Sequence, residues 1–529
     1  MGDGADIIIG IDAGTSVIKA VAFDLKGVQL AASAVRNQYE TREDGSAVQS
    51  LEQTWRDCVA ALRGLAAKVD DLPRRTAGVA VTAQGDGTWL VGRDNRPVGD
   101  AWLWLDARAA PTVTRLSAGP RDRARFEATG TGLNTCQQGS QMAHMDRFFS
   151  ELLDRAGVAL HCKDWLYLNL TGVRATDPSE ASFTFGNFRN RKYDDDAIDA
   201  LGLTHRRALL PEIVDGTEIT HALTTEAAAA TGLLAGTPVS LGYVDMVMTA
   251  LGAGVRTGAG NAACSTIGST GVHTRAKDVA DVELNAEGTG YVICLPIPGV
   301  VTQVQTNMGA TLNIDWLLSV AGDLLTEAGN PVSHADLVSR IDHWLAASKP
   351  GGLIYHPYIS EAGERGPFVN AQARADFIGL SMRHRFPDLL RAVVEGLGMA
   401  TRDCYMAMGD SPSELRLTGG AARSKALRGV LSASVNAPVR ISSREEAGAA
   451  GAAMMSAVAI GAYASMDDCI ADWVTPLLGQ AEAPDAALAE RYDRLYPAYV
   501  DVRQSLPKVW DTLGAEQERA TAEAATRTS

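Results

Sequence analysis

The sequence predicts an α/β protein built from two domains of similar design. Two β-rich runs joined by a glycine-containing turn make up residues 6–24, and the same strand–turn–strand arrangement recurs at 261–275. Strand-like and helix-like segments alternate after each hairpin, which is typical of mixed sheets covered by helices. One hairpin design in both halves of a 529-residue chain therefore indicates a duplicated architecture.

The remaining elements follow in order from periodicity and turn residues. In the first half we expect a helix at 54–69, strands at 77–86 and 237–245, and a helix at 246–254. In the second half we expect a strand at 300–306, a helix at 312–322, a loop-rich block at 351–369, a helix at 386–408, a strand at 414–424 and a helix at 445–462. The last helix is mostly Ala and Gly, which favours close packing in a core over a membrane span. The polar tail 515–529 is expected to be a frayed helix or disordered.

Composition excludes several classes of protein. The net charge is −15 and no basic run occurs, so a nucleic-acid partner is not expected. The seven cysteines include no Cys-x-x-Cys pair, which argues against a zinc ribbon or a disulfide framework. The chain opens without a cationic leader. We therefore expect an enzyme of the reducing cytoplasm with no membrane partner.

A phosphate site, if present, must be made by the two hairpin turns. The sequence contains no Gly-Lys dipeptide, so the P-loop is absent. Backbone N–H groups and hydroxyls of a tight turn can bind an anion, and the candidates are Gly14, Thr15 and Ser16 in the first turn and Gly268, Ser269 and Thr270 in the second. Asp12, just before the first turn, is a candidate Mg²⁺ ligand. An ordinary hairpin is the alternative, but two such turns in corresponding halves favour the phosphate site.

Seven segments, in order, resemble the FGGY family of carbohydrate kinases. They are DAGTS (12–16), TAQGDG (82–87) with WLDAR (104–108), GYVDMVMTALGAG (242–254), TIGSTG (266–271), PYISEAGERGPF (357–368) with ARADFIGL (373–380), TGGAARS (418–424) and EEAGAAGAA (445–453). The resemblance runs from Asp6 to about residue 500. It implies an actin-like, ribonuclease H-like fold of two domains, 1–255 and 256–510, with a catalytic cleft between them and a polar tail at 511–529.

The resemblance also implies roles for individual residues. Asp245 would be the catalytic base, although an isolated Asp between a strand and a helix is more often a helix N-cap. The substrate would be bound by Gln84, Asp86, Trp104, Asp106 and Asp245. The structural alternative is that Trp104 belongs to the core and that Asp106 pairs with Arg108. ATP would be bound by both hairpin turns together with Thr311, Gly419, Gly420 and Ser424, and Mg²⁺ by Asp12.

The substrate-side motif departs from two common members of the family. Glycerol kinases have Arg-Glu and xylulose kinases typically Met-His where this chain has Gly85-Asp86, and Cys136 stands in the place of a substrate-contacting Tyr of glycerol kinases. Gly85 is expected to leave room for more than three carbons. Residues 81–91, 102–108 and 162–172 are most similar to members that act on erythritol. On the nucleotide side Ala421, Leu427 and Thr311 replace the usual Gly, Trp and Gly.

The resemblance therefore predicts an ATP- and Mg²⁺-dependent kinase of a small polyol or sugar, with erythritol as the expected substrate. A pentulose or glycerol is the alternative within the class, and a homodimer is compatible with the sequence. A non-catalytic sensor on the same scaffold is the rival from another class, because actin-like folds also serve regulators. Glycosidase chemistry by Asp86 and Asp106 would leave both hairpins unexplained.

Overall fold

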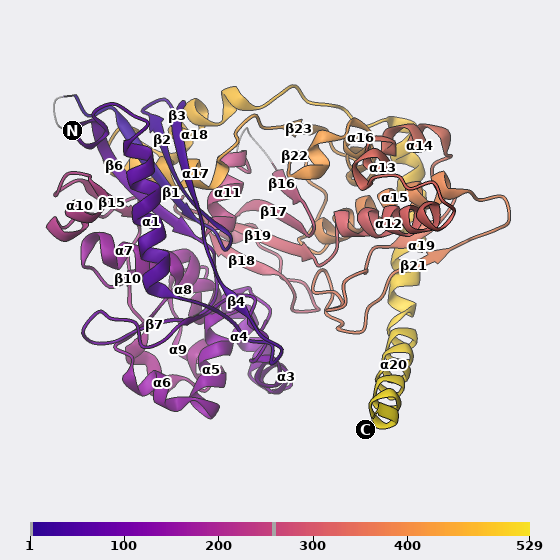
Figure 1. Ribbon diagram of the computed structural model, residues 1–529, viewed down its shortest axis with the longest axis horizontal. Coiled ribbons are helices and arrows are strands. Elements are labelled where there is room, and N and C mark those ends of the chain that lie inside the picture. Colours follow the sequence, from indigo (N-terminus) through magenta and orange to yellow (C-terminus); the bar gives the residue numbers. More distant parts are fainter. Residues whose placement is uncertain (1–3, 257–260, 529) are drawn as a thin grey trace.

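Two six-stranded sheets dominate the computed structural model, which describes residues 4–256 and 261–528. Strands of the first sheet come from the first half of the chain and those of the second sheet from the second half (Figure 1). The predicted α/β class with a duplicated design is thereby confirmed. The domain limits at 255/256 and 510/511 remain a prediction, and residues 1–3, 257–260 and 529 lie outside the described part.

The first sheet has the order β14-β15-β6-β1-β2-β3. Its strands are β1 (Ile7–Ala13), β2 (Val17–Asp24), β3 (Gln29–Arg36), β6 (Thr76–Ala83), β14 (Thr220–Ala222) and β15 (Pro238–Leu241). The β1–β2 hairpin is antiparallel and pairs Asp12 with Lys19, whereas β6 and β15 run parallel to β1. Because parallel strands end at the same edge, the segments that follow β1, β6 and β15 meet there.

The second sheet repeats this plan with the order β18-β19-β17-β16-β22-β23. Its strands are β16 (Ala262–Ile267), β17 (Gly271–Asp278), β18 (Tyr291–Cys294), β19 (Val300–Asn307), β22 (Glu414–Thr418) and β23 (Val439–Ile441). The β16–β17 hairpin is antiparallel, and β22 and β23 are parallel to β16. Both predicted hairpins are therefore confirmed, and they occupy equivalent places in the two sheets.

Helices cover the sheets on both faces. In the first half they are α1 (Leu51–Ala66), α2 (Leu72–Arg75), α3 (Ala110–Ser117), α4 (Asp122–Thr129), α5 (Gln138–Phe148), α6 (Ser150–Arg155), α7 (Cys162–Thr171), α8 (Pro178–Phe185), α9 (Asp195–Ala200), α10 (Thr225–Thr231) and α11 (Asp245–Ala253). In the second half they are α12 (Thr311–Glu327), α13 (His334–Ser339), α14 (Ile341–Ala347), α15 (Phe386–Met406), α16 (Lys425–Val435), α17 (Ala447–Ala459), α18 (Met466–Trp473), α19 (Ala486–Ser505) and α20 (Pro507–Thr528).

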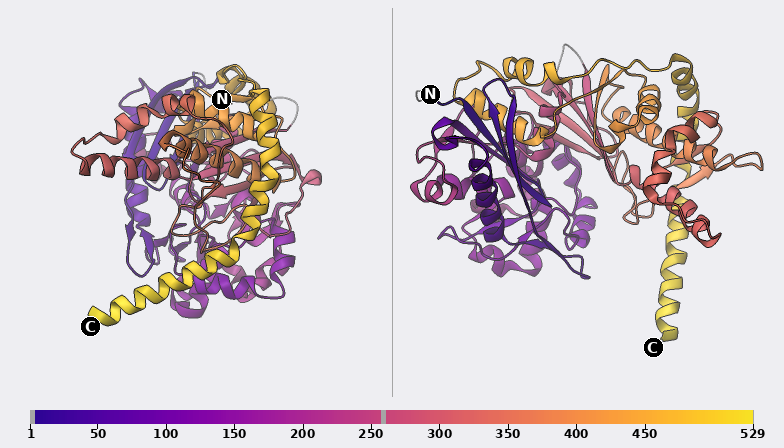
Figure 2. Two further views of the ribbon diagram at one scale, coloured as in Figure 1. Left: turned by 90° about the vertical axis from the view of Figure 1, so that its right-hand side faces the viewer. Right: turned by 45° about the horizontal axis from the view of Figure 1, so that its top comes forward.

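Short strands complete the two halves. They pair as β4 (Glu40–Thr41) with β5 (Ala47–Gln49) and β8 (Ala101–Trp102), β7 (Trp89–Val91) with β9 (Val158–Leu160), β10 (Ala175–Thr176) with β13 (Glu212–Ile213), β11 (Gly186–Asn187) with β12 (Lys192–Tyr193), and β20 (Ile354–His356) with β21 (Asp376–Ile378). The block predicted to be rich in loops, 351–369, contains one short strand, β20. The predicted strand at 414–424 ends at Thr418, where a 3₁₀ turn (Gly420–Arg423) follows. Residues 515–528 of the expected tail belong to α20, which projects away from the rest of the chain (Figure 2).

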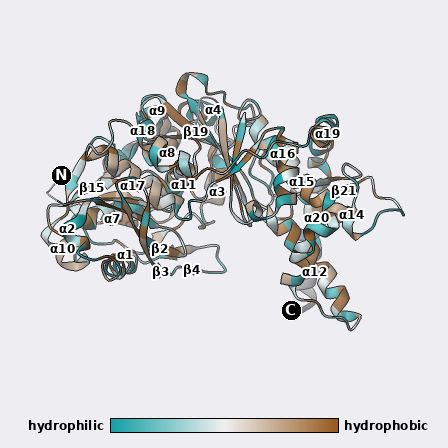
Figure 3. Cartoon of the chain, turned by 90° about the horizontal axis from the view of Figure 1, so that it is seen from above, coloured by the Kyte–Doolittle hydropathy of each residue, from teal (hydrophilic) through white to brown (hydrophobic). Residues whose placement is uncertain are grey.

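Helix α17 belongs to the second half of the sequence but packs on the first sheet. It contacts β1, β6 and α11, as the orange ribbon among the indigo strands shows (Figure 1). One hydrophobic core contains residues of β1, β2, α11 and α17 together with residues of β18 and β19. Brown, hydrophobic segments are frequent in this central part of the molecule (Figure 3). The expectation that 445–462 is a closely packed buried helix is confirmed.

Glycines make this close packing sterically feasible. A Cβ on Gly10 would overlap the Ala449 carbonyl oxygen, and one on Gly451 would overlap the carbonyl oxygen of Met248. Backbone can approach backbone only where the side chain is missing. The small-residue composition of α17 therefore lets it lie directly on β1 and α11. Among the described residues, none of the helices is both long and apolar enough to cross a membrane.

Gly10→Ala should destabilise the protein by about 1–3 kcal/mol, because overpacking of a tight core forces backbone shifts. Gly429→Ala is the matched control: Gly429 lies within α16, is exposed and has no atom within 4 Å of an added Cβ. That control should be neutral or stabilising by up to about 1 kcal/mol. Urea unfolding of both variants provides the measurement. Equal stability of the two variants would contradict the packing argument.

Candidate active site

The tips of both hairpins carry backbone N–H groups without protein partners. Within the described residues, the N–H groups of Thr15, Ser16, Ser269 and Thr270 donate no hydrogen bond, while Gly14 donates to Val17 (3.0 Å) and Gly268 to Thr270 (3.0 Å). Ser16, Ser269 and Thr270 are exposed. Unpaired N–H groups at an exposed turn are suited to an anion.

The hydroxyl of Thr15 is already engaged. It donates to Gln84 Oε1 (2.9 Å) and accepts from the indole Nε1 of Trp104 (2.9 Å). Gln84 in turn donates from Nε2 to Gln49 (2.9 Å). The structure therefore brings together three predicted site residues, but it gives the Thr15 side chain a linking role and leaves the backbone of its turn for the anion.

Asp12 lies at the end of β1, next to the N-terminus of α17. Burial raises the pKa of Asp12 to about 6, against the lowering effect of Lys19. Lys19 also forms an ion pair with Glu446, which precedes α17 (2.7 Å). A Cβ on Gly448 would overlap Asp12 Oδ2. The carboxylate thus occupies a space that exists only because α17 has glycine there.

Asp245 is the first residue of α11, and the preceding linker is held on both sides. Gly242 N–H donates to Val81 (2.9 Å), Thr82 Oγ1 donates to the Tyr243 carbonyl (2.6 Å), and Val244 N–H donates to Ser179 Oγ (3.0 Å). The structural alternative, Asp245 as N-cap, is not what the helix shows, because Val244 occupies that position. Burial raises the pKa of Asp245 well above its usual range, and the neighbouring Asp12, Glu180 and Asp86 raise it further. A carboxylate destabilised in this way is a ready proton acceptor.

Asp86 has a left-handed backbone (φ 58°), a conformation that Asp tolerates better than most residues. Its N–H donates to Glu180 Oε1 (3.3 Å), and its Oδ1 is shielded from solvent without a hydrogen-bond partner in the described chain. Burial raises the pKa of Asp86 to about 6, while Cys136, His161 and Arg365 lower it. A buried acceptor without a partner costs free energy and marks a ligand contact.

The expectation that Gly85 leaves room for a longer substrate is wrong. A Cβ at Gly85 would overlap Val244 Cγ2 and lie 3.3 Å from Glu180 Oε1. The space is filled by the residue that precedes Asp245. Glycine is required here so that the Asp86 loop and the Asp245 linker can pack against each other.

Asp106 does not present a free carboxylate. It is completely buried and accepts hydrogen bonds from Ala47 N–H (2.9 Å) and from the Arg108 backbone and guanidinium (2.5–3.0 Å). Trp104, in contrast, is 41% exposed and attached to Thr15. The geometry favours a structural role for Asp106 and a position at the mouth of the site for Trp104.

The predicted nucleotide side gathers around the second hairpin. Thr311, at the start of α12, donates from its N–H to the Gly268 carbonyl (2.9 Å). A Cβ on Gly419 would lie 2.5 Å from the Ile267 carbonyl oxygen, which places the end of β22 against β16. Gly420 is exposed. Ser424 caps α16 through Leu427 N–H (3.2 Å) and donates to Asp342 (2.7 Å), so its hydroxyl is committed to the protein.

Sequence reasoning missed a buried charged cluster behind Asp86. Lys163 Nζ contacts Asp164 (2.6 Å) and Asp177 (2.5 Å), and His161 lies 3.1 Å from Asp164 and 3.5 Å from Glu180. Burial raises the pKa of Glu180 to about 7, against the lowering effect of His161 and Lys163. No sequence motif marks these residues, since they lie at the starts of α7 and α8, N-cap residues included, and meet only in the folded chain.

Glu364 and Arg365 belong to the segment PYISEAGERGPF, and the structure gives Glu364 a specific set of partners. Glu364 Oε1 accepts from the N–H groups of Met308 (3.0 Å) and Arg365 (2.9 Å), and burial raises the pKa of Glu364 to about 8. The Gly-Glu-Arg sequence was the signal that could have pointed to them.

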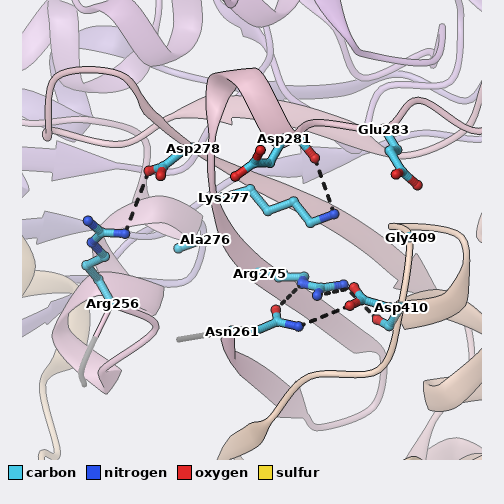
Figure 4. Close-up of a pocket in the computed structure, with 10 residues that line it drawn as sticks. All are labelled: Arg256, Asn261, Arg275, Ala276, Lys277, Asp278, Asp281, Glu283, Gly409 and Asp410. Carbon is cyan, nitrogen blue, oxygen red and sulfur yellow. Dashed lines mark hydrogen bonds and ion pairs between the residues drawn. The ribbon is translucent and has the colours of Figure 1, made fainter. Parts of the chain in front are cut away.

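A cavity of about 600 Å³ on the second sheet is not the candidate site (Figure 4). None of the predicted site residues lines it. Arg275 pairs with Asp410 and Asn261, and Arg256 lies 4.0 Å from Asp278. The sequence therefore gives no reason to place the reaction in this cavity.

Comparison with known proteins agrees with this geometry. Residues 7–252 match the N-terminal domain model of the FGGY family of carbohydrate kinases, and residues 266–460 match its C-terminal domain model. The chain is 73% identical to an erythritol kinase of Brucella abortus (strain 2308), with 97% of this chain and 99% of the relative covered. It is 26% identical to an L-xylulose/3-keto-L-gulonate kinase of Escherichia coli (strain K12), covering 93% and 95%.

Solved structures show the same fold. A xylulose kinase from Rhodospirillum rubrum superposes with a TM-score of 0.85 at 24% identity, covering 96% of this chain and 100% of that one. A gluconate kinase from Lactobacillus acidophilus gives 0.85 at 20% identity, covering 96% and 99%. These likenesses confirm the two-domain actin-like fold. With both family models matched and a relative 73% identical over nearly its full length, the chain belongs to the FGGY family of carbohydrate kinases.

Proposed function

We propose that this kinase transfers the γ-phosphoryl group of ATP to a hydroxyl of erythritol. The observation that carries the substrate is the 73% identity to an erythritol kinase over 515 residues. The chemistry is supported by the site, where Asp245 begins α11 beside Asp12 and close to the unpaired carboxylate oxygen of Asp86. Asp245 would accept the proton of the attacking hydroxyl.

The two hairpins would bind the phosphates of ATP. Their free N–H groups come from equivalent positions of the two sheets, and the Gly268 turn is held against the N-terminus of α12, where the helix dipole also favours negative charge. Gly419 and Gly420 would line the adenosine side. The Thr15–Gln84 and Thr15–Trp104 hydrogen bonds would connect the phosphate turn to the substrate side.

Asp12 fits a Mg²⁺ ion that is shared with the nucleotide. The glycine at position 448 provides the space in which this carboxylate lies beside α17. Within the described residues there is no cluster of three or more His, Cys, Asp or Glu that could hold a metal, which suits an ion bound by one or two carboxylates, water and phosphate oxygens. When bound, Mg²⁺ would neutralise charge on the β- and γ-phosphate oxygens.

Two rival functions are less well supported. A non-catalytic sensor has no use for a buried base beside a metal carboxylate, and a glycosidase would need a second free carboxylate where Asp106 is fully hydrogen-bonded. A pentulose substrate stays as the alternative within the class, because the chain is also 26–27% identical to kinases named for L-xylulose and xylulose.

Asp245→Asn should lower kcat by about 10²–10⁴-fold, the usual cost of removing a general base. Nucleotide affinity should stay within about twofold, because the carboxylate does not bind ATP directly. Steady-state kinetics and calorimetric ATP titration provide the two readouts. Asp100→Asn, at an exposed loop position, is the matched control. A variant with more than half of the wild-type kcat would contradict the assignment of Asp245.

Asp12→Ala should raise the Mg²⁺ concentration needed for half-maximal rate by at least about tenfold, the lower end of what loss of a residue supporting a metal costs. The rate is measured against Mg²⁺ at fixed ATP. Asp323→Ala, on the exposed face of α12, serves as control. An unchanged titration curve would make Asp12 a structural residue only.

The substrate is tested by comparing kcat/KM for erythritol, glycerol, xylitol, D-xylulose and D-ribulose under one condition. Erythritol should exceed glycerol by about 10–200-fold, the usual scale for one missing group. If a ketopentose exceeded erythritol tenfold, the erythritol proposal would fail while the kinase assignment would stand.

A further inference from the structure

Arg365 comes from the second half of the chain but is tied to the substrate side of the first half. Thr289 Oγ1 donates to the carbonyl of Pro367 (2.9 Å), close to Arg365, and Gly290 accepts from Gly132 N–H (2.9 Å). Asn134 then donates to the Tyr291 hydroxyl (3.3 Å). The loop containing Arg365 is therefore joined through 289–291 to the segment 132–136.

That segment adjoins Asp86. The carbonyl of Cys136 accepts from Gly87 N–H (2.9 Å), so Cys136 lies beside the Asp86 loop. Burial raises the pKa of Asp86, Cys136 and Tyr291, and the Arg365 guanidinium is among the charges that lower all three. Contacts and charges agree that Arg365, Tyr291, Cys136 and Asp86 lie near one another.

The backbone of Arg365 is held while its side chain is not. Its N–H donates to Glu364 Oε1 (2.9 Å), and the next carbonyl, of Gly366, accepts from Asn307 Nδ2 (3.0 Å). Among the residues that the structure describes, its half-buried guanidinium has no hydrogen bond and no ion pair. A guanidinium carries five donors and no acceptor, so the Arg365 side chain is available to bind a ligand oxygen.

The Asp86 carboxylate lacks a hydrogen-bond donor at one of its oxygens. Its buried Oδ1 accepts no hydrogen bond, although the Cys136 thiol stabilises the carboxylate, so an unused acceptor lies within electrostatic reach of a guanidinium from the other half of the chain. A hydroxyl group satisfies both, because its proton is donated to the carboxylate while its oxygen accepts from the guanidinium. Vicinal hydroxyls of a polyol present such groups next to each other.

We propose that Arg365 is a specificity-determining residue that donates hydrogen bonds to the polyol hydroxyls bound by Asp86, so that the second domain completes the substrate pocket. This inference rests on the proposed function and names the residue through which that site recognises hydroxyls distant from the phosphorylated carbon. Cys136 and Tyr291 form the adjoining walls.

Arg365→Met is the principal test. It should lower kcat/KM for erythritol by about 10–150-fold, the range for losing a hydrogen bond to a charged group, mainly through KM. The KM for ATP should stay within about twofold. Arg365→Lys keeps the charge without the planar fork and should recover part of the loss. Arg383→Met, at an exposed arginine of the same half, is the matched control and should behave as wild type.

Deoxy analogues test the contact without relying on a variant that folds. Wild-type enzyme should discriminate against butane-1,2,3-triol and butane-1,2,4-triol relative to erythritol, and the discrimination against at least one of them should collapse in Arg365→Met. Equal use of both triols and erythritol by the wild type would overturn the inference.

The remaining outcomes are also decisive. A KM for erythritol within twofold of wild type in a folded Arg365→Met variant would overturn it, and so would a larger effect on the KM for ATP than on that for the polyol, which would indicate a phosphate contact. If wild-type enzyme phosphorylated no polyol at all, the proposed function itself would fail. If it phosphorylated erythritol and Arg365→Met did too with unchanged KM, only the role of Arg365 would fail.

Discussion

The close approach of α17 to β1 and α11 is the constraint on which the rest of the site depends. Gly10, Gly252 and Gly451 each lie where a Cβ would overlap a backbone carbonyl of the neighbouring element. Because no side chains separate these backbones, the end of β1 and the start of α11 are held at a fixed short separation. Asp12 and Asp245 are the residues at those two ends, so packing of glycine and alanine determines how closely two carboxylates meet.

That proximity has an electrostatic cost. Asp12, Asp86, Glu180 and Asp245 all have raised pKa values, chiefly because burial disfavours their ionised forms, and Asp245 is raised further by the other three. Nearby cations offset part of the cost: Lys19 for Asp12, and His161 for Asp86 and Glu180. A bound metal ion or the proton of a substrate hydroxyl stabilises the ionised form of such carboxylates. The clustering of negative charge, which is unfavourable in the free protein, thereby becomes favourable in the complex.

Turn residues and hydrophobic periodicity were sufficient to predict the hairpins and helices that depend on neighbouring residues. The hairpins at β1–β2 and β16–β17 and the buried Ala/Gly helix follow from turn residues and periodicity, and they agree with the structure. The helix predicted at 246–254 is present as α11, but it begins at Asp245, which the sequence predicts as the end of a strand. The errors concern contacts between remote segments. Gly85 suggests open space because the sequence does not show that Val244 fills it. The sequence equally does not reveal that Asp106 accepts a hydrogen bond from Ala47 N–H. Glu180 and Arg365 escaped for the same reason, since their importance lies in what the folded chain places beside them.

The path of the chain also has a consequence for biosynthesis. The face of the first sheet formed by β1 and β6 is covered by α17, which comes hundreds of positions later in the sequence. A ribosome releases the N-terminal strands first, at about 5–20 residues per second. Until residues 447–459 have emerged, the nascent first half exposes the apolar surface of Ile8, Val21 and Ala80 on this face, whereas a second core against α1 and α7 consists of first-half residues alone. Packing of this one face is therefore completed only after residues near the C-terminal end of the second half have been made.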